Sequence, residues 1–208
     1  MIGIADRPRA RYDAGAMGTW LGVVVETRDR SDFWEIAQRH QVVPQVRSAA
    51  PHVFIECQAQ LYFNAPMRLA EALSRDLATM AIGFLAQTAT DVHKLSVFRR
   101  GVCVRRLVYS RDQGGWVRAA GAPQSFERFY FFGGEQKPDM LDDDASREDI
   151  ARYRVAREAG DATGILDILH PSSVLPLIRM VEHFGIDPDS PMGRYERPSW
   201  WKRLLGRR

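Results

Sequence analysis

Apolar and polar residues alternate most regularly along HVFIECQAQLYF, residues 52–63. The apolar positions fall on one face of an extended chain: Val53, Ile55, Cys57, Ala59, Leu61 and Phe63. Glu56, Gln58 and Gln60 fall on the other face. Because successive side chains of a β-strand point to opposite faces, this period of two predicts a strand over the whole stretch.

Shorter apolar runs predict further strands. WLGVVVET (20–27) is nearly continuous, which is typical of a strand buried on both faces. The other predicted strands are MAIGFLAQT (80–88), KLSVF (94–98), VCVRRLVY (102–109) and the short VRAAG (117–121). The aromatic stretch QSFERFYFF (124–132) matches neither period clearly, so we assign it to neither a strand nor a helix.

Two helices are predicted before the chain midpoint. Ser31 is placed to cap a helix that runs to about His40. Asn64 and Pro66 open another, since proline is tolerated in the first helical turn, where its missing N–H has no partner. The apolar stripe of this second helix is formed by Leu69, Leu73 and Leu77.

Two more helices are predicted near the C-terminus. The first spans about 147–159, with Ser146 as its cap, Asp149 three residues further on and Gly160 at its end. The second spans about 173–184. These elements predict an α+β fold: a mainly antiparallel sheet of about five or six strands, with flanking helices and a C-terminal helical part.

Composition shifts divide the chain into segments. We expect a flexible lead-in, an α+β body, an acidic boundary loop, a helical part, and a linker with a basic aromatic tail. Their respective ranges are 1–18, 19–132, 133–146, 147–187 and 188–208.

Five arginines lie between Arg99 and Arg111. The pattern KLSVF, RRG, VCVRRLVY predicts a β-hairpin with Arg99 and Arg100 at its tip. Arg105 and Arg106 are consecutive, so they are expected to point to opposite faces. By strict alternation, Arg106 shares its face with Val102, Val104 and Val108, and Arg105 shares the other face with Cys103, Leu107 and Tyr109. The arginines are therefore expected to be dispersed, with one of them paired or snorkelling.

A nucleic-acid-binding strip is the alternative for this stretch. It requires Arg99, Arg100 and Arg111 to converge with Trp116, because guanidinium groups beside a flat aromatic ring suit unstacked bases. Net charge does not favour it. The chain carries +3, but its last twelve residues hold five cations and no carboxylate, so residues 1–196 carry −2.

Several activities lack their motifs. The sequence has no glycine-rich phosphate loop, no GxSxG elbow and no HExxH pair. Two cysteines are too few for a disulfide scaffold. The acidic run DMLDDDASRED lacks the glycine and terminal glutamate of a calcium loop, so we interpret it as capping and solubilising. No metal and no cofactor are expected.

One strand face offers candidates for acid–base chemistry. Glu56 on that face, with Asp91 and His93 at the opening of the next strand pair, are the catalytic candidates. They would serve an enzyme or a small-ligand binder only if their faces are adjacent, which the sequence does not determine. A solvated sheet face is the alternative.

The tail SWWKRLLGRR is the most distinctive local feature. Trp200, Trp201, Lys202 and Arg203 are the partner-binding candidates, because tryptophan and arginine are frequent hot-spot residues. Packing on the parent domain and peripheral contact with an anionic membrane are alternatives. No apolar run reaches the ~18 residues of a transmembrane helix, and the N-terminus has no signal-peptide core, so a cytoplasmic location is expected.

The block 73–127 resembles small uncharacterised bacterial proteins. These have a helix ending in an LSREL-like phrase, a hairpin with an RRL-Y core, a tryptophan-bearing turn and a G-x-P-x-x-[WF]-E phrase, the last matched by Gly121, Pro123, Phe126 and Glu127. The resemblance implies no catalytic residue. The leading hypothesis is a non-enzymatic, protein-binding module, such as an immunity or regulatory partner. The alternatives are a nucleic-acid binder using the hairpin tip and tail, and an enzyme or ligand binder near Glu56.

Overall fold

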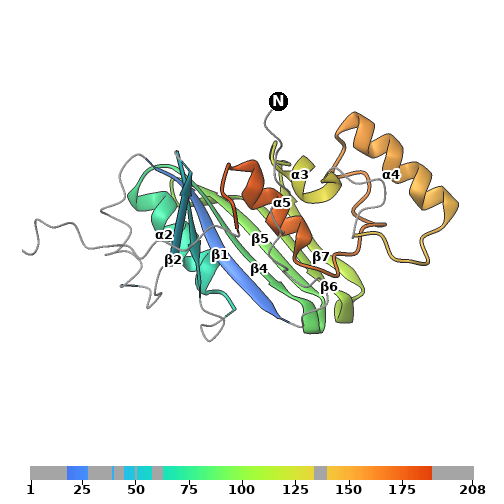
Figure 1. Ribbon diagram of the computed structural model, residues 1–208, viewed down its shortest axis with the longest axis horizontal. Helices are drawn as coiled ribbons and strands as arrows, with labels where there is room; N and C mark the ends of the chain where they lie inside the picture. Colours follow the sequence, from blue (N-terminus) through green and yellow to red (C-terminus); the bar gives the residue numbers. More distant parts are fainter. Residues whose placement is uncertain are drawn as a thin grey trace, which may run out of the picture.

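The structure is a computed structural model, and it describes residues 18–27, 39, 45–49 (backbone only), 51–57, 63–133 and 140–188. Within these ranges the chain forms one antiparallel sheet of seven strands in the order β2-β3-β1-β4-β5-β6-β7 (Figure 1). The strands are β1 (Thr19–Glu26), β2 (Gln45–Ala49), β3 (His52–Glu56), β4 (Met80–Gln87), β5 (Val92–Arg99), β6 (Val102–Ser110) and β7 (Gly115–Gly121).

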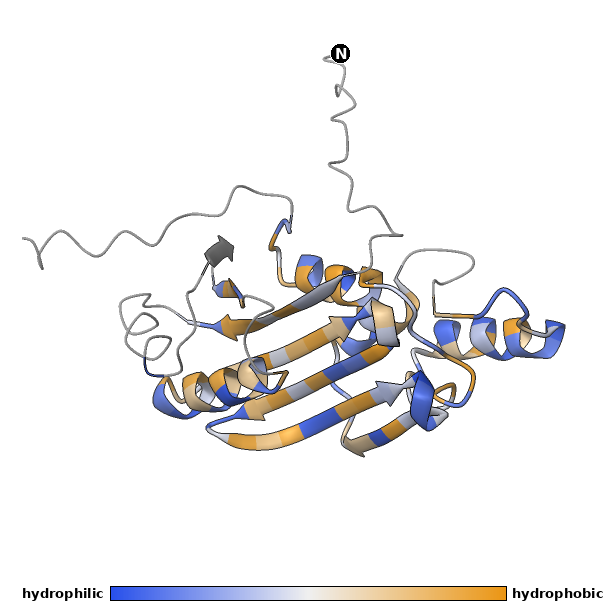
Figure 2. Cartoon of the chain, turned by 90° about the horizontal axis from the view of Figure 1, so that it is seen from below, coloured by the Kyte–Doolittle hydropathy of each residue, from blue (hydrophilic) through white to orange (hydrophobic). Residues whose placement is uncertain are grey.

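Helices lie on both faces of the sheet. On one face lies α2 (Ala65–Asp76), which packs on β4, β1 and β5 and makes fewer contacts with β6. On the other lie the short α3 (Glu127–Phe132) and α5 (Leu175–His183), which contact each other. The helix α4 (Arg147–Ala159) projects beyond the end of the sheet and is hydrophilic over most of its length (Figure 2). Only Tyr153 and Ala156 of α4 are buried.

Two apolar clusters fill the spaces between these layers. The cluster under α2 contains Leu69 and Leu73 of the helix with Leu21, Val23, Val53, Ile55 and Phe98 of the strands. The cluster on the other face joins Trp20, Phe54, Phe84 and Leu95 to residues of α3, α4 and α5. The C-terminal helices therefore share a core with the sheet.

The α+β class and the mainly antiparallel sheet are confirmed. The sheet has seven strands, whereas five or six were expected. The strand that was missed is β2, QVRSA, which has no apolar run or regular alternation to mark it. The predicted strand at 52–63 ends at Glu56, and residues 58–62 lie outside the described residues. The helix expected from Ser31 also lies outside them, apart from Arg39.

The caps of α4 are confirmed. Ser146 Oγ accepts a hydrogen bond from the backbone N–H of Asp149, whose side chain accepts one from the N–H of Ser146. Gly160 ends the helix in the left-handed region. The stretch 124–132, assigned to neither state, contains α3.

The hairpin of β5 and β6 is confirmed, with Arg100 and Gly101 as its two-residue turn, both at positive φ. One part of the face assignment is wrong. A β-bulge shifts the register between Val97 and Phe98, so Cys103 pairs with Phe98 on the α2 side, and Val104 packs against the opposite cluster with Arg105. Beyond the bulge, Arg105 and Arg106 project to opposite faces as predicted.

No helix in the described parts of the chain is long and apolar enough to cross a bilayer.

Candidate functional site

A polar groove of about 360 Å³ lies between α2 and the adjoining faces of β5 and β6. The described residues that line it share one side of the sheet: Asn64, Met67, Arg68, Glu71, Lys94, Ser96, Phe98, Arg106 and Val108. Three of them are cations and one is a carboxylate. We call this cavity the basic groove.

The position of α2 is set by a glycine. A Cβ on Gly83 would lie 2.7 Å from the carbonyl oxygen of Pro66, so only glycine lets the first turn of α2 approach the sheet this closely. Gly83 pairs with Ser96 on β5. The close approach therefore places the start of α2 as one wall of the groove and Ser96 at its base.

The β5–β6 register brings two cations together on the groove floor. Lys94 pairs with Val108, and Ser96 pairs with Arg106, so Lys94 and Arg106 are diagonal neighbours. Diagonal neighbours lie roughly 7–8 Å apart. Neither cation makes an ion pair with a residue that the structure describes.

Ser96 is the buried polar group of the groove. It is 3% exposed and lines the cavity. Its hydroxyl has no hydrogen-bond partner among the described residues. Among the described residues, the Ser96 hydroxyl does not belong to the fully buried polar atoms that lack a partner, so it opens on the groove, where it can donate to an acceptor.

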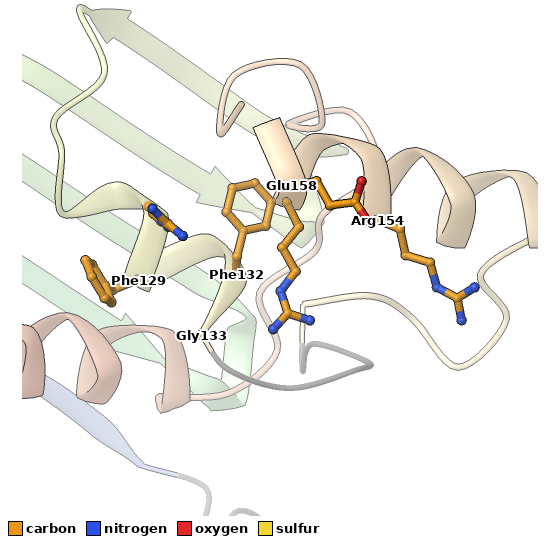
Figure 3. A pocket seen from close by; sticks show the side chains of 7 residues that line it. Phe129, Phe132, Gly133, Arg154 and Glu158 are labelled. Carbon is orange, nitrogen blue, oxygen red and sulfur yellow. The ribbon is translucent and has the colours of Figure 1, made fainter. Parts of the chain in front are cut away.

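A larger hollow of about 490 Å³ lies between α3 and α4 (Figure 3). Its described lining consists of Arg128, Phe129, Phe132, Gly133, Arg154, Arg157 and Glu158. Gly133 at its border precedes residues 134–139, which lie outside the described residues. The basic groove is the better-defined site, because the register of β5 and β6 fixes its floor.

The catalytic candidates Glu56, Asp91 and His93 are not brought together. Two strands, β1 and β4, separate Glu56 on β3 from His93 on β5, a distance of about 14 Å. Asp91 accepts a hydrogen bond from Arg111 at 2.9 Å. The adjacency required for acid–base chemistry is therefore absent.

His93 is buried in the apolar cluster under α3 and α5. Its Nδ1 lies 3.5 Å from the hydroxyl of Tyr130, and its Nε2 has no partner among the described residues. Burial lowers the pKa of His93 to about 3, so the imidazole is neutral in the folded protein.

The four nucleic-acid candidates are also separated. Arg99 and Arg100 are exposed at the hairpin tip, whereas Arg111 and Trp116 lie at the other end of β6, about 27 Å away along nine residues. Trp116 packs against Tyr109 and donates a hydrogen bond from Nε1 to the Leu169 carbonyl at 2.7 Å. The convergence that the nucleic-acid strip requires is absent from the described structure.

Arg105 is the paired arginine of the hairpin. It is 2% exposed and forms a bidentate pair with Glu127, donating from Nε at 2.9 Å and from Nη2 at 2.8 Å. Its Nη1 donates to the carbonyl of Gly121, and Glu127 accepts a further hydrogen bond from the N–H of Gln124. Gly121 and Glu127, two residues of the G-x-P-x-x-[WF]-E phrase, therefore supply the acceptors for the buried guanidinium of Arg105.

Trp200, Trp201, Lys202 and Arg203 lie outside the described residues. Partner binding by the tail, membrane contact, a cytoplasmic location and independence of metals and cofactors therefore stay predictions. So does the resemblance to small bacterial proteins.

Sequence reasoning missed the basic groove, although one signal was present. Lys94, Ser96 and Arg106 are polar residues inside strands that otherwise read as apolar. Their convergence depends on the β5–β6 register and on the placement of α2, neither of which a local pattern encodes.

Comparisons of the chain with models of protein families, with curated proteins and with solved structures gave no match. The function is therefore inferred from the chemistry of the site.

Proposed function

We propose that this protein binds a small phosphate-bearing molecule in the basic groove. The observation that carries the proposal is the pair of cations Lys94 and Arg106 on the groove floor, which flank Ser96 and make no ion pair with a described residue. A phosphate supplies the charge that offsets these cations and the acceptor oxygens that the hydroxyl lacks.

The location differs from the ligand pocket expected near Glu56. That residue shares its sheet face with Phe54, whose cluster is covered by the C-terminal helices, whereas the groove opens on the α2 face. The proposal therefore keeps the small-ligand binder among the alternatives drawn from the sequence, but places the ligand on a different set of residues. Arg68 and Asn64, at the open side of the groove, are placed to contact the rest of the ligand.

The K94A/R106A variant is expected to lower the affinity for inorganic phosphate at least tenfold, because both floor cations are removed. Isothermal titration calorimetry at fixed ionic strength measures the change. The matched control is R99A/R100A, which removes the same charge from the exposed tip of the same hairpin and is expected to change the affinity less than twofold.

The S96A variant separates hydrogen bonding from charge. Removing a hydroxyl that opens on the groove and has no described partner is expected to leave stability nearly unchanged, yet to weaken phosphate binding. Equal phosphate binding by the wild type, S96A and K94A/R106A would contradict the proposal.

A further inference from the structure

A third cation extends the floor of the basic groove across the sheet. Arg118 on β7 pairs with Val108 on β6, which pairs in turn with Lys94 on β5. Directly paired residues of an antiparallel sheet project from the same face, so Lys94, Val108 and Arg118 form one row on the α2 side. The Cα atoms at the two ends of the row lie about 10 Å apart, with Arg106 in the next row between them.

The carboxylate that lines this face, Glu71, comes from α2 and not from the outer strands. The strands β5, β6 and β7 contain no aspartate and no glutamate. Arg118 is exposed and makes no ion pair with any residue in the described ranges. Long lysine and arginine side chains reach across such a separation, so Lys94, Arg106 and Arg118 can contact a single elongated anion.

We infer that the ligand of the basic groove is a chain of two or three linked phosphates, with one phosphate on Ser96, Lys94 and Arg106 and the next extending toward Arg118. This inference rests on the proposed function. It names a subsite that a single phosphate leaves empty.

A nucleic-acid strand fits this face less well. Binding of single strands relies on aromatic side chains that stack with the bases. On the α2 side of β5–β7 the aromatic residue is Phe98, which is 3% exposed beneath α2. Tyr109 and Trp116 project from the opposite side of the sheet. A compact polyphosphate group needs cations and hydroxyl donors, which the face provides.

The test compares orthophosphate, pyrophosphate and tripolyphosphate by calorimetry on the full chain at constant ionic strength. The wild type is expected to bind pyrophosphate at least tenfold more tightly than orthophosphate. The R118A variant is expected to lose about tenfold of the pyrophosphate affinity and less than twofold of the orthophosphate affinity. The control is R128A, which removes one exposed arginine from the hollow between α3 and α4 and is expected to change neither.

Three outcomes would overturn the inference. Orthophosphate binding that depends on Lys94 and Arg106, without a preference for pyrophosphate, would reject the second subsite and keep the proposed function. Absence of binding by all three anions would reject both. A single-stranded oligonucleotide that binds more tightly than tripolyphosphate and depends on Arg118 would assign the face to nucleic acid.

Discussion

Replacing Glu127 by alanine is expected to lower the free energy of unfolding by about 3–5 kcal/mol. The variant leaves the guanidinium of Arg105 buried under α3 without its bidentate partner, and the Gln124 N–H loses its acceptor. An uncompensated buried charge is among the most destabilising changes that one substitution produces. Urea denaturation followed by circular dichroism measures the loss.

The double variant R105M/E127M identifies the cause. Replacing both members of a buried ion pair by apolar side chains of similar size is often nearly neutral. We therefore expect the double variant to be more stable than E127A, with a remaining cost from the carbonyl of Gly121, which loses its donor. A loss below 1 kcal/mol in E127A would contradict this explanation, because it would mean that Arg105 is not left as an uncompensated buried charge.

Acidification is expected to destabilise the protein through His93. Its pKa is about 3 in the folded protein, because burial disfavours the charged imidazole, whereas an unfolded histidine has a pKa near 6.5. The unfolded state therefore binds a proton that the folded state does not, and stability falls as the pH decreases from about 6.5 towards 3. Between pH 7 and pH 4 this contributes on the order of 3 kcal/mol.

The H93L variant removes this titration while keeping a side chain of comparable volume. Unfolding free energies of wild type and variant should be compared at several pH values between 4 and 8. Carboxylates titrate in both proteins, so the difference between the two slopes isolates the histidine. Parallel pH profiles would contradict a buried, neutral His93.

Much of the fold could be predicted because its signals are local. The cap of α4 depends on Ser146 and Asp149, three residues apart, and the stripe of α2 depends on leucines one turn apart. The opposite projection of Arg105 and Arg106 also follows from strand geometry alone. Strict alternation failed at Val104, because a bulge inserts one extra residue there. The residues that precede it in the strand therefore point to the faces opposite to those predicted.

The site depends on contacts between distant segments, which explains why it was not predicted. Arg105 and Arg106 are neighbours in the chain, yet one is neutralised by Glu127 while the other lines the groove. The difference arises from which helix covers each face of the sheet. On the face of Arg105, α3 supplies Glu127 as a partner. On the face of Arg106, α2 packs mainly on β4, β1 and β5, and Arg106 lines the groove beside it. Similarly, Glu56 and His93 both lie in strands, but strand order keeps them apart.

The most direct test of phosphate binding in the basic groove is to map the bound anion by NMR. Backbone amide shifts of the ¹⁵N-labelled protein should be followed during titration with pyrophosphate. The groove predicts that the largest shifts cluster at residues 64–68, 94–96 and 106–108, and that they are lost in the K94A/R106A variant. Largest shifts at residues 128–133 and 154–158 would place the anion in the hollow between α3 and α4 and contradict the proposal.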